Sequence, residues 1–191
     1  MRNAKFNSLL EEIHNYGING ETREIFLHGH FHDEDEDPST DWRMCNKFIK
    51  NIRLLDDQQG NIIVHQNNSG GDWHQGMAIY DAIAQCKCYV IIVCHGSAMS
   101  MGSIIPQAAD LRLMMPHCDF MVHDGYSDIG GGMTYRNAQT WAAFEKRATK
   151  IMMDIYIEAC EGSVLFAGKT PKQIKHAIDH KLKTLHDYEQ Y

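Results

Sequence analysis

A serine, a histidine and a glycine pair follow apolar runs, and these residue types could carry out nucleophilic hydrolysis. Ser100 lies among small residues shortly after the apolar run 89–93. A serine hydroxyl is a weak nucleophile at neutral pH and needs a base, for which His123, at the end of another apolar run, is a candidate. A backbone amide of the Gly70-Gly71 pair and the amide of Met101 could stabilise an oxyanion. These residues favour acyl transfer through Ser100.

Each of these residues also has a simpler interpretation. Ser100 could only cap the helix that follows it, a position that serine often occupies. His123 could be a half-buried structural histidine, because only geometry identifies a general base. A third group, usually a carboxylate, should orient the base. The downstream candidates are Asp154, Glu158, Asp179 and Asp187.

Strands and helices that would position these residues alternate along the chain. Apolar runs predict strands over 24–28, 61–65, 89–93, 111–115 and 120–123. Periodic apolar positions predict helices over 5–16, 42–55, 73–85, 104–109, 134–160 and from 171 onward. This alternation predicts an α/β fold whose loops at the carboxyl ends of strands carry the chemistry. The longest helix would extend on the order of 40 Å, so we expect part of it to meet a partner subunit.

Composition excludes several classes of protein. The chain has 191 residues and a formal net charge of -7, so non-specific nucleic-acid binding is not expected. No apolar run approaches the roughly 18 residues that span a membrane, and the N-terminus lacks the apolar stretch of a secretory signal. The six cysteines include no C-x-x-C pair, which favours free thiols in a reducing cytoplasm over disulfides or zinc. We expect a single cytoplasmic domain, residues 1–191, without a metal or cofactor.

Two further clusters have residue types that could bind metal or undergo redox chemistry. Alternating histidines at 28–32 precede an acidic run at 33–36 and could bind a divalent metal. Because no second block of ligands accompanies them, we expect a solvated acidic loop instead. Cys86 and Cys88 straddle a helix end and a strand start, where we expect small apolar side chains rather than redox chemistry.

Four segments resemble the ClpP family, the proteolytic subunit of the ATP-dependent Clp protease, in the same order and with similar spacing. The segments are 67–71 (NNSGG), 76–81 (GMAIYD), 96–102 (GSAMSMG) and 116–123 (PHCDFMVH). The family has N-S-P-G-G, G-M-A-I-Y-D, G-Q-A-A-S-M-G and P-N-S-R-V-M-I-H at these places. The resemblance covers roughly residues 20–191. It implies an α/β, ClpP/crotonase-type fold with repeated β-β-α units and a long protruding helix.

The resemblance also implies a serine endopeptidase that cleaves unfolded polypeptides. Ser100 is then the nucleophile, His123 the base, and Gly71 and Met101 supply the amides of the oxyanion hole. The family forms stacked heptameric rings that enclose the active sites, and an ATP-driven AAA+ unfoldase delivers the substrate. The chain has no G-x-x-x-x-G-K-[ST] motif, so the partner would use the ATP.

The chain departs from the family pattern at the third catalytic residue and at both ends. The family's orienting aspartate falls on Lys181 or His180, depending on the anchor chosen, and a shift of one or two residues brings in Asp179, which we predict as the orienting residue. Residues 1–19 diverge from the family's N-terminal loops, and the family's last strand has no counterpart before the chain stops at Tyr191. With these departures the chain resembles a phage-type member of the ClpP family.

Other functions are compatible with the same fold. A catalytically inactive ring component would keep the architecture without the chemistry, and a phage prohead-type protease would share the mechanism with another substrate. A crotonase-type acyl-CoA enzyme shares the fold and the oxyanion hole but needs no Ser–His pair. An ordinary α/β-hydrolase does not fit, because Ala98 occupies the first glycine position of G-x-S-x-G.

Overall fold

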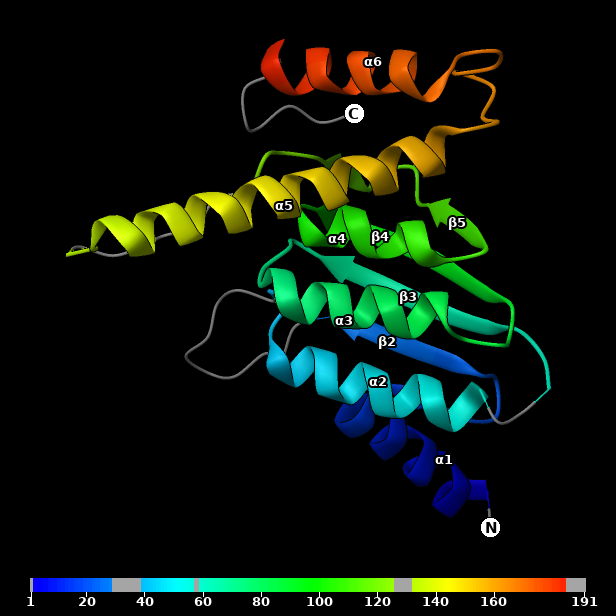
Figure 1. Ribbon diagram of the computed structural model, residues 1–191. Coiled ribbons are helices and arrows are strands. Elements are labelled where there is room, and N and C mark those ends of the chain that lie inside the picture. The colour runs from blue at the N-terminus through cyan, green and yellow to red at the C-terminus, as the bar shows by residue number, and fades with distance from the viewer. Residues whose placement is uncertain (1, 29–38, 57–58, 126–131, 185–191) are drawn as a thin grey trace. The chain divides into compact units, whose positions relative to one another are not determined.

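The computed structural model describes residues 2–28, 39–56, 59–125 and 132–184. The chain divides into two compact units, with the boundary between Met121 and Val122. Unit one contains the sheet and the helices that connect its strands, and unit two contains two further helices (Figure 1).

Unit one is built on a mainly parallel sheet. Across the sheet, the order of the described strands is β1 (Ile18–Asn19), β2 (Glu24–His28), β3 (Ile62–Asn68), β4 (Val90–Met99) and β5 (Leu111–Met114), while β6 (Asp119–Met121) pairs with the end of β4. The short β1 runs antiparallel to β2, and the other pairs are parallel. The predicted alternation of strands and helices is confirmed, and it brings the carboxyl ends of β3 and β4 to the same edge.

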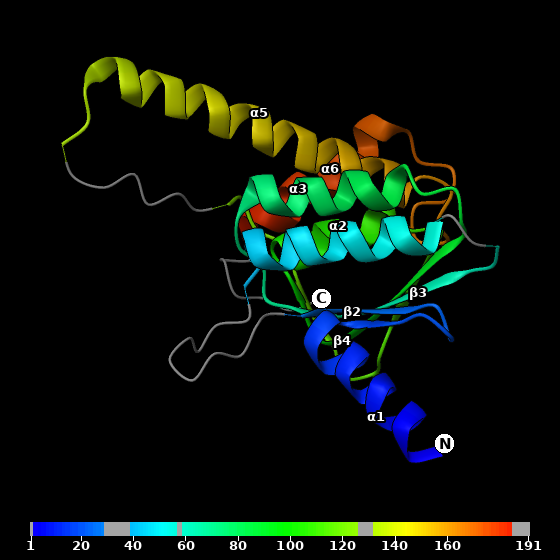
Figure 2. The same cartoon turned by 90° about the horizontal axis from the view of Figure 1, so that it is seen from below.

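Two amphipathic helices, α2 (Trp42–Asp56) and α3 (Trp73–Ala84), cover one face of this sheet and lie side by side on it (Figures 1 and 2). The apolar residues of α2 that face the sheet, among them Cys45, Phe48, Ile52 and Leu55, are buried, while Trp42 at its start is exposed. Every second residue of the central strands points toward these helices, so Val64 and Ile92 have no exposed surface. Helix α1 (Arg2–Glu11), which continues into the π-helical turn η1 (Glu12–Tyr16), lies on the opposite side of the sheet (Figure 2).

Strand β4 is longer than predicted. It continues past residue 93 to Met99, because Ser97–Met99 pair with β6 and Ala98 pairs with Asn68 of β3. Gly96, at φ +60°, bends the strand between its two sets of partners. The bend re-aims the end of β4, so the chain reaches Ser100 along a strand rather than through a loop.

The helix after Ser100 also differs from the prediction of 104–109. It begins earlier, as α4 (Met101–Ile104), and continues as the 3₁₀ turn η2 (Ile105–Ala108). Pro106 lacks an amide hydrogen for α-helical bonding, which accounts for the change from α4 to a 3₁₀ turn at this point.

Unit two contains the long helix α5 (Tyr135–Cys160) and α6 (Pro171–Thr184), which runs back beside it (Figure 1). Thr134 caps α5 by accepting a hydrogen bond from the Asn137 amide at 3.2 Å. The 26 residues of α5 confirm the predicted helix, and its fully buried residues lie in its carboxyl-terminal half: Ala148, Met152, Met153, Ile155 and Tyr156.

Some predictions fall outside the described residues. These are the histidines at positions 30 and 32, the acidic run 33–36, and Asp187. In the part of the chain that the structure describes, no helix is both long and apolar enough to cross a membrane.

Candidate active site

Ser100 occupies the turn between β4 and α4 in a backbone conformation that is rare for a residue with a side chain. Its φ of 51° and ψ of −121° lie outside the regions that non-glycine residues ordinarily adopt. The amide of Ser100 donates to the carbonyl of Met121 at 2.9 Å. The carbonyl of Ser100 accepts from the amide of Ser103 at 2.9 Å and from its hydroxyl at 2.6 Å. Bonds on both sides of Ser100 therefore hold the strained turn.

Met101, the first residue of α4, follows Ser100 directly. The first amides of a helix have no carbonyl partner within that helix, and they carry its partial positive charge. An oxyanion formed on a carbonyl that Ser100 attacks would develop beside this helix start. The Met101 amide is therefore suited to the role predicted for it.

The glycine pair lies in the loop that follows β3, and Gly70 lies against Ser100. Gly70 has φ +110°, and a Cβ at this position would lie 2.6 Å from the Ser100 Cβ and 3.1 Å from its Oγ. Gly71 has φ +136°, and a Cβ there would lie 2.5 Å from the carbonyl oxygen of Thr40. Both positions combine a left-handed φ with a close neighbour, so both need glycine.

Hydrogen bonds from Thr40 and Asn68 hold the glycine loop in place. The Gly70 amide donates to Asn68 Oδ1 at 2.9 Å, and the Asn68 amide group bonds the hydroxyl of Thr40 at 2.9 Å. The amide of Thr40 donates to the carbonyl of Gly70, and the Thr40 carbonyl accepts from the Asp72 amide at 2.8 Å. The Thr40 and Asn68 side chains are at most 1% exposed, so solvent does not compete for these bonds.

Gln66 joins β3 to the start of the helix that follows Ser100. Its Nε2 donates to the carbonyl of Gly102 at 2.7 Å from a fully buried position. A Cβ at Gly102 would collide with the carbonyl oxygen of Asn68, so glycine is needed for this close approach. Thr40, Gln66 and Asn68 were not predicted as site residues. Gln66 is a polar residue at a core-facing position of β3, and this was the signal in the sequence that could have identified it as a site residue.

The structure places the predicted site residues in both units. Ser100, Gly71 and Met101 come together in unit one around the end of β4. His123 follows β6 by two residues and is half-buried, and it belongs to unit two. Asp179 is half-buried on α6, also in unit two. The triad that would join the two units stays a prediction.

Two of the other carboxylates considered for the orienting role are described. The Asp154 carboxylate is 58% exposed and pairs with the Lys150 ammonium one helical turn away, at 2.5 Å. Glu158 is exposed near the end of α5. Because an orienting carboxylate is usually shielded from water, Asp179 stays the stronger candidate of these three.

Cys94, on the core side of β4 before Ser100, offers no second nucleophile. Burial raises the pKa of its thiol to about 12, so the side chain is neutral at physiological pH. Gln66 Nε2, on the neighbouring strand β3, lies 3.7 Å from the sulfur.

The chain is similar to known proteins in sequence and in fold. The profile of the Clp protease family matches residues 21–180. The chain is 33% identical over 118 residues to the ATP-dependent Clp protease proteolytic subunit of Deinococcus radiodurans, a match covering 60% of this chain and 57% of that protein. It is 34% identical over 139 residues to the same subunit of Streptococcus suis, covering 69% and 65%. A match to the chloroplastic subunit 3 of Arabidopsis thaliana is 38% identical over 90 residues, covering 45% and 29%.

These matches span less than two thirds of the length of the curated relatives. The fold is similar to that of a point mutant of ClpP1 from Listeria monocytogenes, with a TM-score of 0.64 and 21% sequence identity, over 82% of this chain and 79% of that one. This likeness confirms the predicted ClpP-type α/β fold. The family profile covers well over half of the residues, and the chain therefore belongs to the Clp protease family.

Proposed function

We propose that the chain is a serine endopeptidase that cleaves unfolded polypeptides through Ser100. The observation that carries this proposal is the strained φ of 51° at Ser100, held between β4 and α4 with Gly70 against its side chain. Strained conformations persist where surrounding structure enforces them, and they concentrate at active sites. A serine with only a helix-capping role would not need it, and no hydrogen bond from an α4 amide to the Ser100 side chain accompanies the cap.

In the proposed mechanism Ser100 Oγ attacks the carbonyl carbon of the scissile peptide, and His123 accepts the hydroxyl proton. The oxyanion is stabilised by the amides of Gly71 and Met101. His123 then returns the proton to the leaving amine, which leaves an acyl-enzyme on Ser100. Water, deprotonated by His123, releases the acyl group and restores the serine. Asp179 would orient the imidazole and stabilise its charged form.

His123 is supported as the base by its place in the chain. Met121, whose carbonyl accepts the hydrogen bond from the Ser100 amide, precedes His123 by two residues. Three consecutive Cα atoms span at most about 7–8 Å, so a histidine at this position is tethered close to the Met121 backbone. This short tether in the chain supports the proposal that His123 is the base for Ser100.

We further propose that the chain works in stacked heptameric rings, in the cytoplasm, and receives substrate from an AAA+ unfoldase. Membership of the Clp protease family supports this assembly. The exposed amino-terminal half of α5, which carries the edge-to-face pair Trp141 and Phe144 at 5.7 Å, has the apolar groups for contact with another subunit.

Labelling with a fluorophosphonate probe tests the catalytic proposal. We expect covalent modification of Ser100, mapped by mass spectrometry, in an assembled ring whose size is measured by sedimentation. The Ser100→Ala variant should neither react nor hydrolyse a fluorogenic peptide, while Ser97→Ala, three residues earlier on β4, should do both. An assembled ring in which Ser100 does not react would favour the inactive ring component instead.

A further inference from the structure

Three side chains with metal-binding atoms meet at the end of the sheet away from Ser100. Asp56 ends α2, while Cys86 and Cys88 lie between α3 and β4. One carboxylate oxygen and the two sulfur atoms all lie within 4.8 Å of one another. Ligands of a tetrahedral zinc ion stand about 3.5–4 Å apart, so a small inward movement of these atoms would complete a site.

The carboxylate of Asp56 already fixes the turn that carries both cysteines. Its Oδ1 accepts from the amides of Lys87 at 2.7 Å and Cys88 at 3.1 Å, and from the Cys86 thiol at 3.1 Å. These contacts show that the two cysteines are not simply apolar filling, as their sequence context suggested. They also mean that the three ligands are positioned before any ion arrives, which reduces the entropic cost of binding.

The electrostatic surroundings suit a cation bound by thiolates. Helices α2 and α3 both end here, and helix carboxyl termini carry partial negative charge. The Arg23 guanidinium lies 3.4 Å from Cys88 Sγ and 3.0 Å from the Leu55 carbonyl. Two thiolates and one carboxylate carry three negative charges, which a divalent ion and Arg23 together balance.

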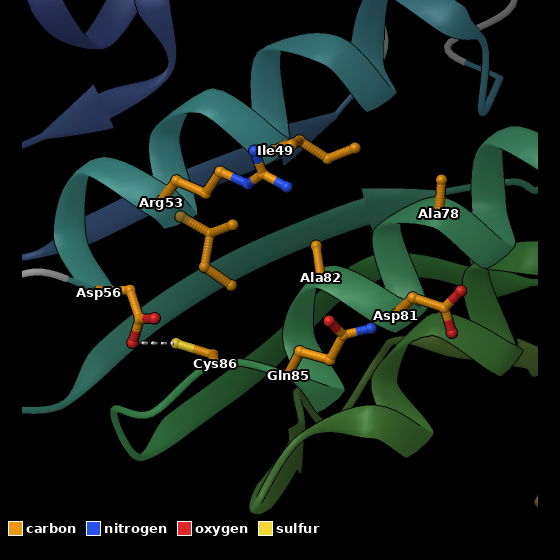
Figure 3. Close-up of a pocket in the computed structure, with 9 residues that line it drawn as sticks. Ile49, Arg53, Asp56, Ala78, Asp81, Ala82, Gln85 and Cys86 are labelled. Atoms are coloured by element: carbon orange, nitrogen blue, oxygen red, sulfur yellow. Dashed lines mark hydrogen bonds between the residues drawn. The ribbon is translucent and has the colours of Figure 1, made fainter.

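A cavity of about 340 Å³ between α2 and α3 gives access to the cluster (Figure 3). Asp56 and Cys86 both line it, and Figure 3 shows the Cys86 thiol pointing toward the Asp56 carboxylate at its edge. Arg53, Asp81 and Gln85 form other parts of the wall. An ion can therefore reach two of the three ligands through the cavity, and a water molecule could occupy its fourth coordination position.

We propose that Asp56, Cys86 and Cys88 form a zinc-binding site. Thiolates favour Zn²⁺ over hard cations such as Mg²⁺, and three protein ligands leave one position for water. On binding, the two S–H bonds break, two protons pass to solvent, and two Zn–S bonds form without any change of oxidation state. The ten residues of β4 separate this site from Ser100 by about 30 Å, so the inference is independent of the peptidase proposal.

Titration of the reduced, metal-free full chain with Zn²⁺, and with Co²⁺ as a spectroscopic substitute, tests the site. We expect one ion per chain and, with Co²⁺, an intense sulfur-to-metal charge-transfer band. Cys86→Ser and Cys88→Ser should each reduce the intensity of the band and weaken metal binding by at least about 10–100-fold, and the double variant should lack the band. Cys160→Ser, at a half-buried thiol on α5, is the matched control and should leave binding and the band unchanged.

A second measurement uses the unaltered chain, in case a variant fails to fold. Zn²⁺ should protect Cys86 and Cys88 from iodoacetamide, as mapped by mass spectrometry, while the reactivity of Cys160 stays the same. Binding without a charge-transfer band and without protection of these two thiols would place the ion elsewhere, for example on the histidines at 28–32, and would overturn the proposal. Absence of Zn²⁺ binding would overturn it as well.

Discussion

The backbone amide of Ser100 donates a hydrogen bond to the carbonyl oxygen of Met121 at a distance of 2.9 Å. This bond continues the pairing of β4 with β6, in which Met99 lies opposite Met121, by one residue beyond the end of β4. A positive φ at a serine is costly unless the surrounding structure enforces it. The short strand β6 supplies part of that enforcement, and His123 is the second residue after it in the chain.

Gly70→Ala should lower peptidase activity by about 10²-fold or more. The new methyl group would lie 2.6 Å from Ser100 Cβ, closer than packed carbon atoms approach, and φ +110° disfavours any side chain. Either the loop or Ser100 must move, so the oxyanion donors leave their positions. Loss of one such donor typically lowers kcat by about 10²–10³-fold, and a fluorogenic peptide assay measures the effect.

Gly20→Ala is the matched control for this substitution. No atom lies within 4 Å of a Cβ built at Gly20, and its φ is not in the left-handed region. Activity and fluorophosphonate labelling should both stay at the wild-type level. If Gly70→Ala kept full activity in a correctly assembled protein, the loop would not be part of the catalytic site.

Asn68→Ala should destabilise unit one and lower activity. It removes the acceptor of the Gly70 amide and the partner of the Thr40 hydroxyl, and leaves both buried without those bonds. A buried polar group without a partner costs about 1–3 kcal/mol, so we expect a loss of this size in the free energy of unfolding. Denaturant titration gives the stability, and peptide hydrolysis gives the accompanying change in kcat.

A double-mutant cycle with Thr40→Val isolates the side-chain interaction. The effects of the two substitutions should be less than additive by about 0.5–3 kcal/mol, because each removes the same hydrogen bond. Thr40→Ser keeps the hydroxyl and should retain most of the stability. If the losses of stability from the two substitutions were additive, the hydrogen bond between Thr40 and Asn68 would make no contribution to the free energy of unfolding.

Local sequence patterns predicted those helices and strands whose bounds are set by residues close together in the chain. The strand predicted over 24–28 has the bounds of β2, because three consecutive apolar residues, 25–27, form a short run that ends at a polar residue on each side. The break at Pro106 follows from its missing amide. The extension of β4 to Met99 was not predicted, since it depends on pairing with β6, which lies more than twenty residues further along the chain.

The residues that support the oxyanion loop could not be predicted from local sequence patterns either, because their contacts also join distant parts of the chain. Thr40 and Asn68 are separated by 28 positions, and no residue pattern near either one indicates that their side chains form a hydrogen bond. Gly70 and Gly71 could be recognised, because paired glycines between a strand and a helix indicate a close backbone approach. A helical pattern around Asp179 establishes the helix but cannot establish which buried group that carboxylate faces.

Asp41→Asn should lower stability in a pH-dependent way. Burial disfavours the Asp41 carboxylate, but the Met44 amide at 2.8 Å and the Arg43 guanidinium at 2.6 Å outweigh it and lower its pKa below 3.8. A lowered folded-state pKa gives stability that is present above the unfolded-state pKa and is lost as the pH falls through the folded-state value. The difference in unfolding free energy between wild type and variant should therefore shrink below about pH 4.

Asp41→Ala removes the cap of α2 as well as the charge, and should cost about 1 kcal/mol at pH 7. Glu161→Gln, at an exposed position after α5, serves as the control for the loss of one carboxylate. Thermal unfolding monitored by circular dichroism from pH 3 to pH 7 gives both comparisons. A wild-type advantage that grew at low pH would contradict the assigned direction of the pKa shift.

Asp179→Asn should lower kcat for peptide hydrolysis by about 10²–10⁴-fold with little change in KM, because an uncharged amide cannot stabilise the imidazolium form of His123. Labelling of Ser100 by a fluorophosphonate should slow in parallel. Asp154→Asn, at an exposed carboxylate paired with Lys150, is the matched control and should retain wild-type rates. If Asp179→Asn stayed active while Ser100→Ala did not, the nucleophile assignment would stand and the orienting group would have to be sought among other carboxylates.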